Sequence, residues 1–156
     1  MRWTITKTQA ADTAGDLLVY PVFQKNDKAD LKSVLKADLK KQVSSSGFEA
    51  SASSLLPIYD ASCKAGWVLL AGLGAAEKVG LDHIRRLAGT VAKHARKMKA
   101  ERILLVVPPS AIINIDDQAF ARAWVEGAEM ALFAVGILKT AKKTKELPVS
   151  WKLLAD

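Results

Sequence analysis

The sequence predicts an α/β domain in which a mixed β-sheet lies between helices. Short, nearly continuous apolar runs are typical of buried strands, and three occur at 17–22, 67–71 and 103–107. Two longer segments, 81–99 and 117–131, instead repeat apolar residues at the helical period. Such alternation along the chain is typical of layered α/β domains. With 156 residues, half of them apolar, the chain fits one domain spanning 1–156.

The first third of the chain is expected to form two short strands and a helix. The strands are predicted at 5–8 and 16–23, with a turn at 13–15 between them. Asp27 and Asp30 have the chemistry of a helix start, so a helix is expected from there to the serine–glycine run at 44–47. Its apolar residues fall on one helical face: Leu31, Val34, Leu35, Leu39 and Val43.

The segment Gly66-Trp67-Val68-Leu69-Leu70-Ala71-Gly72-Leu73-Gly74 is the most informative part of the chain. After a weaker strand at 55–59, it predicts a buried strand that ends at Ala71 and enters a tight turn at 72–78. Turns of this kind can bind nucleotide phosphates through backbone amides. Glu77 stands where a dinucleotide fingerprint needs a third glycine, and no Gly-Lys-Ser/Thr sequence follows. We therefore favour a packed turn over a nucleotide site.

The helix expected over 81–99 has one apolar and one basic face. The apolar stripe runs from Leu81 to Met98, and five cations on the other side form a candidate phosphate-binding face: Arg85, Arg86, Lys93, Arg96 and Lys97. The formal charge of +7 favours acidic partners such as nucleic acid. The alternative is an ordinary solvated helix face. No aromatic residue lies among these cations, which argues against the stacking of single-stranded bases.

The last third is expected to add a strand, a long helix and a final strand. The strand at 102–107 stops at Pro108-Pro109, and Asp116-Asp117 begin the helix, where acids are favoured. Gly127, in the middle of that helix, predicts a close approach of the helix to the sheet. A lysine-rich connector at 139–145 follows. After it, the alternation at 149–153 is typical of an edge strand.

The sequence offers no recognisable catalytic or metal-binding constellation. His83 and His94 lie eleven residues apart on one predicted helix, on the order of 16 Å, so they cannot share a metal ion and are expected to be solvated. No serine lies in a Gly-x-Ser-x-Gly elbow. We expect no catalytic, cofactor-binding or metal-binding residue in this chain, and therefore no cofactor.

Cysteine use and hydropathy predict a cytoplasmic protein that does not enter a membrane. Cys63 is the only cysteine, which excludes an internal disulfide and fits a reducing compartment. The N-terminus has no apolar signal core, and the longest apolar run, 130–138, is half as long as a membrane span.

Two motifs resemble the leucyl aminopeptidase (cytosol aminopeptidase) family. The first is Val68-Leu69-Leu70-Ala71-Gly72-Leu73-Gly74, followed by Glu77-Lys78 and the Arg-Arg-Leu-Ala-Gly helix. The second is the helix Trp124-Val125-Glu126-Gly127-Ala128-Glu129-Met130-Ala131-Leu132-Phe133, followed by lysines and a final strand. Their order and spacing are similar to the N-terminal domain of that family over almost the whole chain.

The resemblance implies a three-layer fold like that of macro domains and a non-catalytic role in assembly or regulation. In the resembling enzymes a separate C-terminal domain holds two divalent metals, zinc or manganese, and six copies assemble into a hexamer. The signature of that catalytic domain, Asn-Thr-Asp-Ala-Glu-Gly-Arg, does not occur in these 156 residues. The implied partners are therefore the catalytic domain of a parent peptidase and its other subunits. A stand-alone module that binds nucleic acid through 81–99, or a nucleotide at 72–78, is the alternative.

Overall fold

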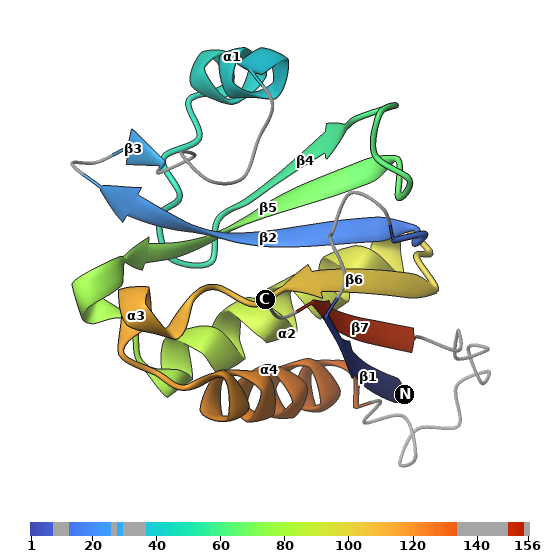
Figure 1. Ribbon diagram of the computed structural model, residues 1–156, viewed down its shortest axis with the longest axis vertical. Helices are drawn as coiled ribbons and strands as arrows, with labels where there is room; N and C mark the ends of the chain where they lie inside the picture. The colour runs from blue at the N-terminus through green and yellow to red at the C-terminus, as the bar shows by residue number, and fades with distance from the viewer. Residues whose placement is uncertain (8–12, 26–27, 30–36, 134–149, 155–156) are drawn as a thin grey trace, which may run out of the picture.

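The computed structural model describes residues 1–7, 13–25, 28–29, 37–133 and 150–154. Their helices and strands follow the predicted order, with three short additions: β3, the 3₁₀ turn η2 and α3 (Figure 1). The elements are β1 Arg2–Thr6, β2 Leu17–Lys25, β3 Lys28–Ala29, α1 Ala37–Ser46, β4 Leu55–Tyr59, β5 Trp67–Ala75, η2 Ala76–Lys78, α2 Leu81–Lys97, β6 Arg102–Val106, α3 Ser110–Ile113, α4 Asp117–Leu132 and β7 Ser150–Leu154.

The strands form one mixed sheet in the order β1-β7-β6-β2-β5-β4, with β3 paired to the end of β2. Each neighbouring pair from β1 to β5 is parallel, whereas β4 runs antiparallel to β5. The helices α2 and α4 cover one face, and α1 lies on the other side of the sheet (Figure 1). This arrangement confirms the predicted three-layer α/β fold with a mixed sheet.

Alternating side chains along the central strands feed two separate apolar cores. In β2, Leu17 and Val19 face the core under α2 and α4, while Leu18 and Val22 face the core under α1. Both sets are almost completely buried. Because successive side chains of a strand point to opposite faces, a nearly continuous apolar run is what a strand covered on both sides requires.

Gly127 brings two helices together, and the prediction that it serves helix-to-sheet contact was wrong. A Cβ atom at this position would collide with the backbone of Arg85 on α2. A Cβ at Gly89 of α2 would lie 3.1 Å from the Cβ of Ala131 on α4. The two helices therefore approach each other closely at small residues. The contact is between α2 and α4, which lie in the same layer, and not between a helix and the sheet.

Three further predictions about the strands and the first helix were wrong. The strand β5 does not stop at Ala71 but continues through both glycines to Ala75. The strand β7 is not an edge strand, since it pairs with β1 on one side and β6 on the other. Lys28–Ala29 is a strand paired with β2 and not the first turn of a helix. Asp27, Asp30 and the segment 31–36 lie outside the described residues.

Two sets of side-chain contacts hold neighbouring strands of the sheet together. Trp3 of β1 stacks on Trp151 of β7 with 5.1 Å between ring centroids, and its Nε1 donates to Glu129 of α4. Asp16, just before β2, accepts from the amides of Glu101 and Arg102 and pairs with the Arg102 guanidinium. These bonds hold the start of β6 against the start of β2.

Candidate functional site

The glycine segment 72–74 is a packed part of the sheet. The amide of Gly72 donates to Ser54 and its carbonyl accepts from Ser53, while the amide of Gly74 donates to Ala50. A Cβ at Gly72 would collide with Ser51 and Ser54. Gly74 has a positive φ of 79°, where the register between β2 and β5 shifts. The glycines thus admit the loop 50–54 beside β5, and their amides are already bonded within the protein.

The predicted basic face divides into one paired and four exposed cations. Arg85 lies against α4, where its guanidinium contacts Glu126 at 2.8 Å and Asp82 of its own helix at 2.8 Å. Arg86, Lys93, Arg96 and Lys97 are exposed, and the described residues offer none of the four an ion-pair partner. The structure therefore uses Arg85 to join α2 to α4 and leaves four cations on the outer side of α2.

The two histidines have different surroundings. His83 is exposed, and its Nδ1 accepts from the amide of Gly80, so it caps the start of α2. His94 was expected to be solvated, and this was wrong: it is half-buried, and its Nε2 is buried without a hydrogen-bond partner among the described residues. It lies three residues after Val91 and so borders the apolar stripe of α2. Burial, with a smaller effect of Lys97, lowers the pKa of His94.

The carboxylates of the long helix α4 have structural partners. Asp116 caps the helix by accepting from the amide of Ala119, as predicted. Hydrogen bonds from Arg85 and then Arg122 hold the pKa of Glu126 below its ordinary value. Glu129 accepts from the indole of Trp3. Within the described part of the chain, no group of three or more His, Cys, Asp or Glu side chains could hold a metal ion.

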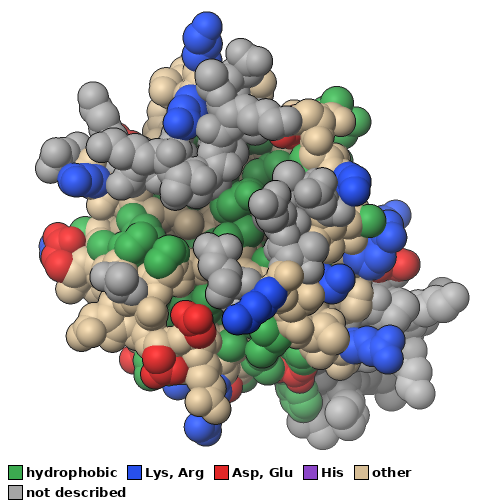
Figure 2. All heavy atoms as spheres, viewed as in Figure 1, with side chains coloured by type: hydrophobic (Ala, Val, Ile, Leu, Met, Phe, Trp, Pro, Cys, Tyr) green, Lys and Arg blue, Asp and Glu red, His purple; other side chains and the backbone are tan. Residues whose placement is uncertain are grey.

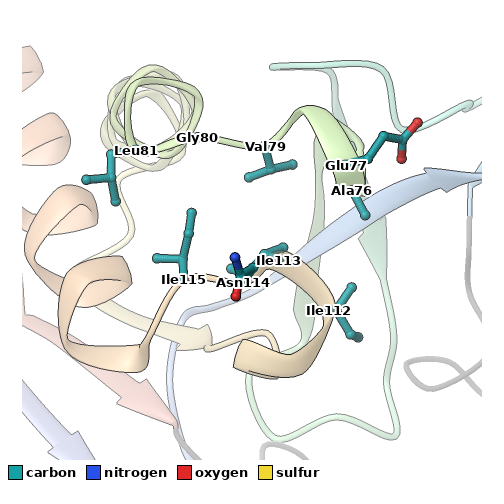
Figure 3. A pocket seen from close by; sticks show the side chains of 9 residues that line it. All are labelled: Ala76, Glu77, Val79, Gly80, Leu81, Ile112, Ile113, Asn114 and Ile115. Carbon is teal, nitrogen blue, oxygen red and sulfur yellow. The ribbon is translucent and has the colours of Figure 1, made fainter.

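A shallow pocket lies at the carboxyl ends of the parallel strands, where ligands of α/β proteins are commonly bound. It is formed by the segment after β5 and by α3 with the residues that follow it, and its volume is about 380 Å³ (Figure 3). Its lining residues are Ala76, Glu77, Val79, Gly80, Leu81, Ile112, Ile113, Asn114 and Ile115. Five of these are large and aliphatic, and its polar side chains are an amide and a carboxylate, although polar atoms make up more of the exposed lining than apolar atoms do.

Sequence reasoning placed the candidate ligand site at 72–78 and missed the second wall of this pocket. The pocket shares only Ala76 and Glu77 with that segment. The missed wall, 112–115, follows Pro108-Pro109 and lies in a four-residue helix and its left-handed C-cap, Asn114. The available signal was the cluster of three isoleucines around an asparagine, outside any segment with strand or helix periodicity.

Comparison with solved structures defines the class of fold. The macro domain of ganglioside induced differentiation associated protein 2 matches 99% of this chain with a TM-score of 0.72 at 10% identity. A tomato leucine aminopeptidase mutant matches the whole chain with a TM-score of 0.74 at 14% identity, over 32% of its own length. The bottromycin maturation enzyme BotP matches 92% of the chain with a TM-score of 0.63. The fold is therefore a macro-domain-like α/β sandwich.

Sequence comparison then gives the family. The model described as "Cytosol aminopeptidase family, N-terminal domain" matches residues 19–142. A probable cytosol aminopeptidase of Cyanothece sp. is 31% identical over 133 residues, which cover 81% of this chain and 26% of that protein. One of Thermosynechococcus vestitus is 28% identical over 94% of this chain and 31% of its own length. The chain belongs to the cytosol aminopeptidase family and corresponds to its N-terminal domain.

The chain spans less than a third of the length of these two relatives. Among the described residues, no helix has the length and apolar character needed to cross a lipid bilayer.

Proposed function

We propose that this chain is a non-catalytic domain of a leucyl aminopeptidase-like metallopeptidase and that it acts in assembly or regulation of the parent enzyme. The observation that carries the proposal is the match of residues 19–142 to the N-terminal domain of a peptidase family, in relatives more than three times as long. In the proposed parent, a following domain holds two divalent metals, zinc or manganese, and removes N-terminal residues from peptides.

The roles of the described charged side chains support a non-catalytic domain. Asp16 joins β2 to β6, Asp116 caps α4, and Glu126 joins α4 to α2. Two-metal hydrolysis needs several converging carboxylates that are free to bind metal. Acids committed to capping and to arginine pairs do not supply such a set.

A peptidase assay on the purified chain tests the non-catalytic part. We expect no release of leucine from a leucine amide substrate in the presence of Mn²⁺ or Zn²⁺. Metal-dependent turnover that a chelator removes, and that copurifies with the chain, would overturn this part of the proposal.

The transcript tests the parent enzyme. We expect the reading frame to continue past the codon for Asp156 into a segment with Asn-Thr-Asp-Ala-Glu-Gly-Arg and clustered acids. A stop codon directly after Asp156 would contradict the proposed parent. The proposed homohexamer and cytoplasmic location rest on the family resemblance, and sedimentation of the whole parent protein would measure its subunit number.

A second candidate function, binding of duplex nucleic acid, is supported by the four exposed cations of α2. Arg86, Lys93 and Lys97 fall on one stripe of the helix, about 16 Å from first to last. A contact of four cations with phosphates predicts that affinity falls about 100-fold between 50 and 200 mM salt.

Substitution of these cations tests the second candidate. Replacing Lys93, Arg96 and Lys97 with alanine should weaken duplex binding and flatten its dependence on salt. Replacing Lys40 and Lys41 of α1 with alanine is a control that also removes positive charge but leaves α2 intact. Equal losses in both variants, or no binding of duplex at low salt, would exclude the face on α2.

A further inference from the structure

The pocket between η2 and α3 has an apolar floor that is open to solvent. Val79, Leu81 and Ile115 point into the space between the two segments (Figure 3). Leu81 remains 39% exposed and Ile112 49% exposed, although both are large aliphatic side chains. On the face seen in Figure 2, hydrophobic side chains gather over this end of the sheet, with acidic side chains beside them. An aliphatic group that entered the pocket would cover this surface.

The polar groups of the pocket select a peptide segment as the occupant. The Asn114 carboxamide lies beside aliphatic side chains (Figure 3); it is exposed, and the described residues offer it no hydrogen-bond partner. A carboxamide offers one acceptor and two donors, which matches the N–H and C=O of a peptide backbone. Asn114 can therefore fix a short extended segment whose aliphatic side chain points into the pocket.

The charges at the rim favour a basic segment over an anionic ligand. None of the nine lining residues is Lys or Arg, and the Glu77 carboxylate lies at the rim and points outward (Figure 3). One cation, Lys78, is exposed between the lining residues Glu77 and Val79. Asp116 and Asp117 directly follow the lining residue Ile115, and both are exposed. A phosphate here would meet carboxylates, whereas a lysine or arginine beside the buried aliphatic residue would meet an opposite charge.

We propose that this pocket binds a peptide segment with an aliphatic side chain flanked by basic residues. The aliphatic side chain fills the space between Val79 and Ile115, the Asn114 carboxamide bonds to the peptide backbone, and Glu77 contacts a flanking cation. This inference goes beyond the proposed function and does not depend on a parent enzyme, because every group it uses lies within the described chain.

An NMR titration of the ¹⁵N-labelled 156-residue chain with short blocked peptides tests the proposal. Acetyl-Lys-Ile-Lys-amide should shift the amides of the pocket residues. Acetyl-Lys-Gly-Lys-amide should bind about tenfold more weakly, because it lacks the aliphatic group. Acetyl-Glu-Ile-Glu-amide should bind about fivefold more weakly, because its charges are repelled at the rim.

Three variants test separately the apolar wall, the carboxamide and the rim carboxylate of the pocket. Ile112→Ser removes an exposed apolar wall and should weaken binding of the Lys-Ile-Lys peptide. Asn114→Gly keeps the left-handed backbone but should lose the backbone contact. Glu77→Gln should reduce the preference for Lys-Ile-Lys over Glu-Ile-Glu, because Asp116 and Asp117 remain. Ile5→Ser is the matched control, because Ile5 is an exposed isoleucine of β1. This variant should bind the Lys-Ile-Lys peptide as the unsubstituted chain does.

Several results would overturn the proposal. These are equal binding of the acidic and basic peptides, shifts centred outside the pocket, or binding unaffected by Ile112→Ser. Failure of the Lys-Ile-Lys peptide to shift the pocket amides at millimolar concentration would also overturn it. Adenosine monophosphate that shifted these amides more strongly than the peptide would instead assign the pocket to a nucleotide. A negative titration would leave the peptidase and transcript tests unaffected.

Discussion

The two faces of the sheet are covered by different kinds of structure. On one face, the helices α2 and α4 lie side by side over a large apolar core that contains Phe120 and Trp124. On the other face, α1 and the segment around Ala50 cover a smaller core to which Ile58 and Ala65 contribute. One face is thus closed by long regular helices, and the other partly by irregular backbone.

The difference shows how a loop can replace a second helix. The loop 50–54 lies beside β5 and exchanges backbone hydrogen bonds with Gly72 and Gly74. To do so, Ala50 and Ser53 adopt positive φ values of 58° and 64°. Non-glycine residues rarely adopt this conformation, so the packing around them must maintain it. The loop-covered face therefore depends on backbone geometry as well as on apolar burial.

The largest expected effect comes from the centre of the helix-covered face. Trp124 is completely buried, so Trp124→Ala should lower the free energy of unfolding by about 3–5 kcal/mol. Val43 of α1 is also buried, and Val43→Ala should lower the free energy of unfolding by about 1–2 kcal/mol, because far fewer atoms are removed than from Trp124. Urea denaturation of both variants measures the difference. A loss for Val43→Ala as large as that for Trp124→Ala would contradict this order.

A smaller effect is expected where α2 and α4 cross. Gly127→Ala should lower stability by about 1–3 kcal/mol, because the new Cβ collides with the backbone of Arg85. Gly89→Ala is a control with a milder clash. Its Cβ would lie 3.1 Å from the Cβ of Ala131 and 3.3 Å from the carbonyl oxygen of Gly127, so its loss of stability should be smaller. A stabilising Gly127→Ala would mean that helix propensity outweighs the close approach.

The smallest expected effect lies where the central strands β2 and β6 begin. Asp16→Asn should cost about 1–2 kcal/mol at pH 7, because the charged acceptor for the Glu101 and Arg102 amides is lost. The side-chain hydrogen bond from Arg102, opposed by partial burial, lowers the pKa of Asp16 below its ordinary value of 3.8.

The loss of stability caused by Asp16→Asn should depend on pH. Since folding lowers the pKa of Asp16, the stabilisation by its charge is present above the ordinary pKa of 3.8 and is lost as the pH falls through the folded pKa. Urea midpoints of both proteins should therefore differ at pH 7 and converge as the pH falls below the folded pKa of Asp16. A difference that stayed constant with pH would show that the Asp16 charge is not the cause.

The candidate sites could be predicted only in part. The basic stripe on α2 follows from helical periodicity, and four of its cations are exposed as expected. The ion pair between Arg85 and Glu126 could not be predicted, because the two residues are 41 apart in the sequence and meet only when α4 packs on α2. The pocket was missed because its walls come from two loops that only the sheet brings together.

The sequence by itself determined the order and type of most elements and the family to which the chain belongs. Apolar runs and helical periods are local properties, so 67–71, 81–99 and 117–131 could be assigned from neighbouring residues alone. Tertiary structure decided what those elements meet. It placed β7 inside the sheet, extended β5 through its glycines and made Gly127 a helix–helix contact. Those outcomes depend on contacts between residues far apart in the chain, which local patterns do not encode.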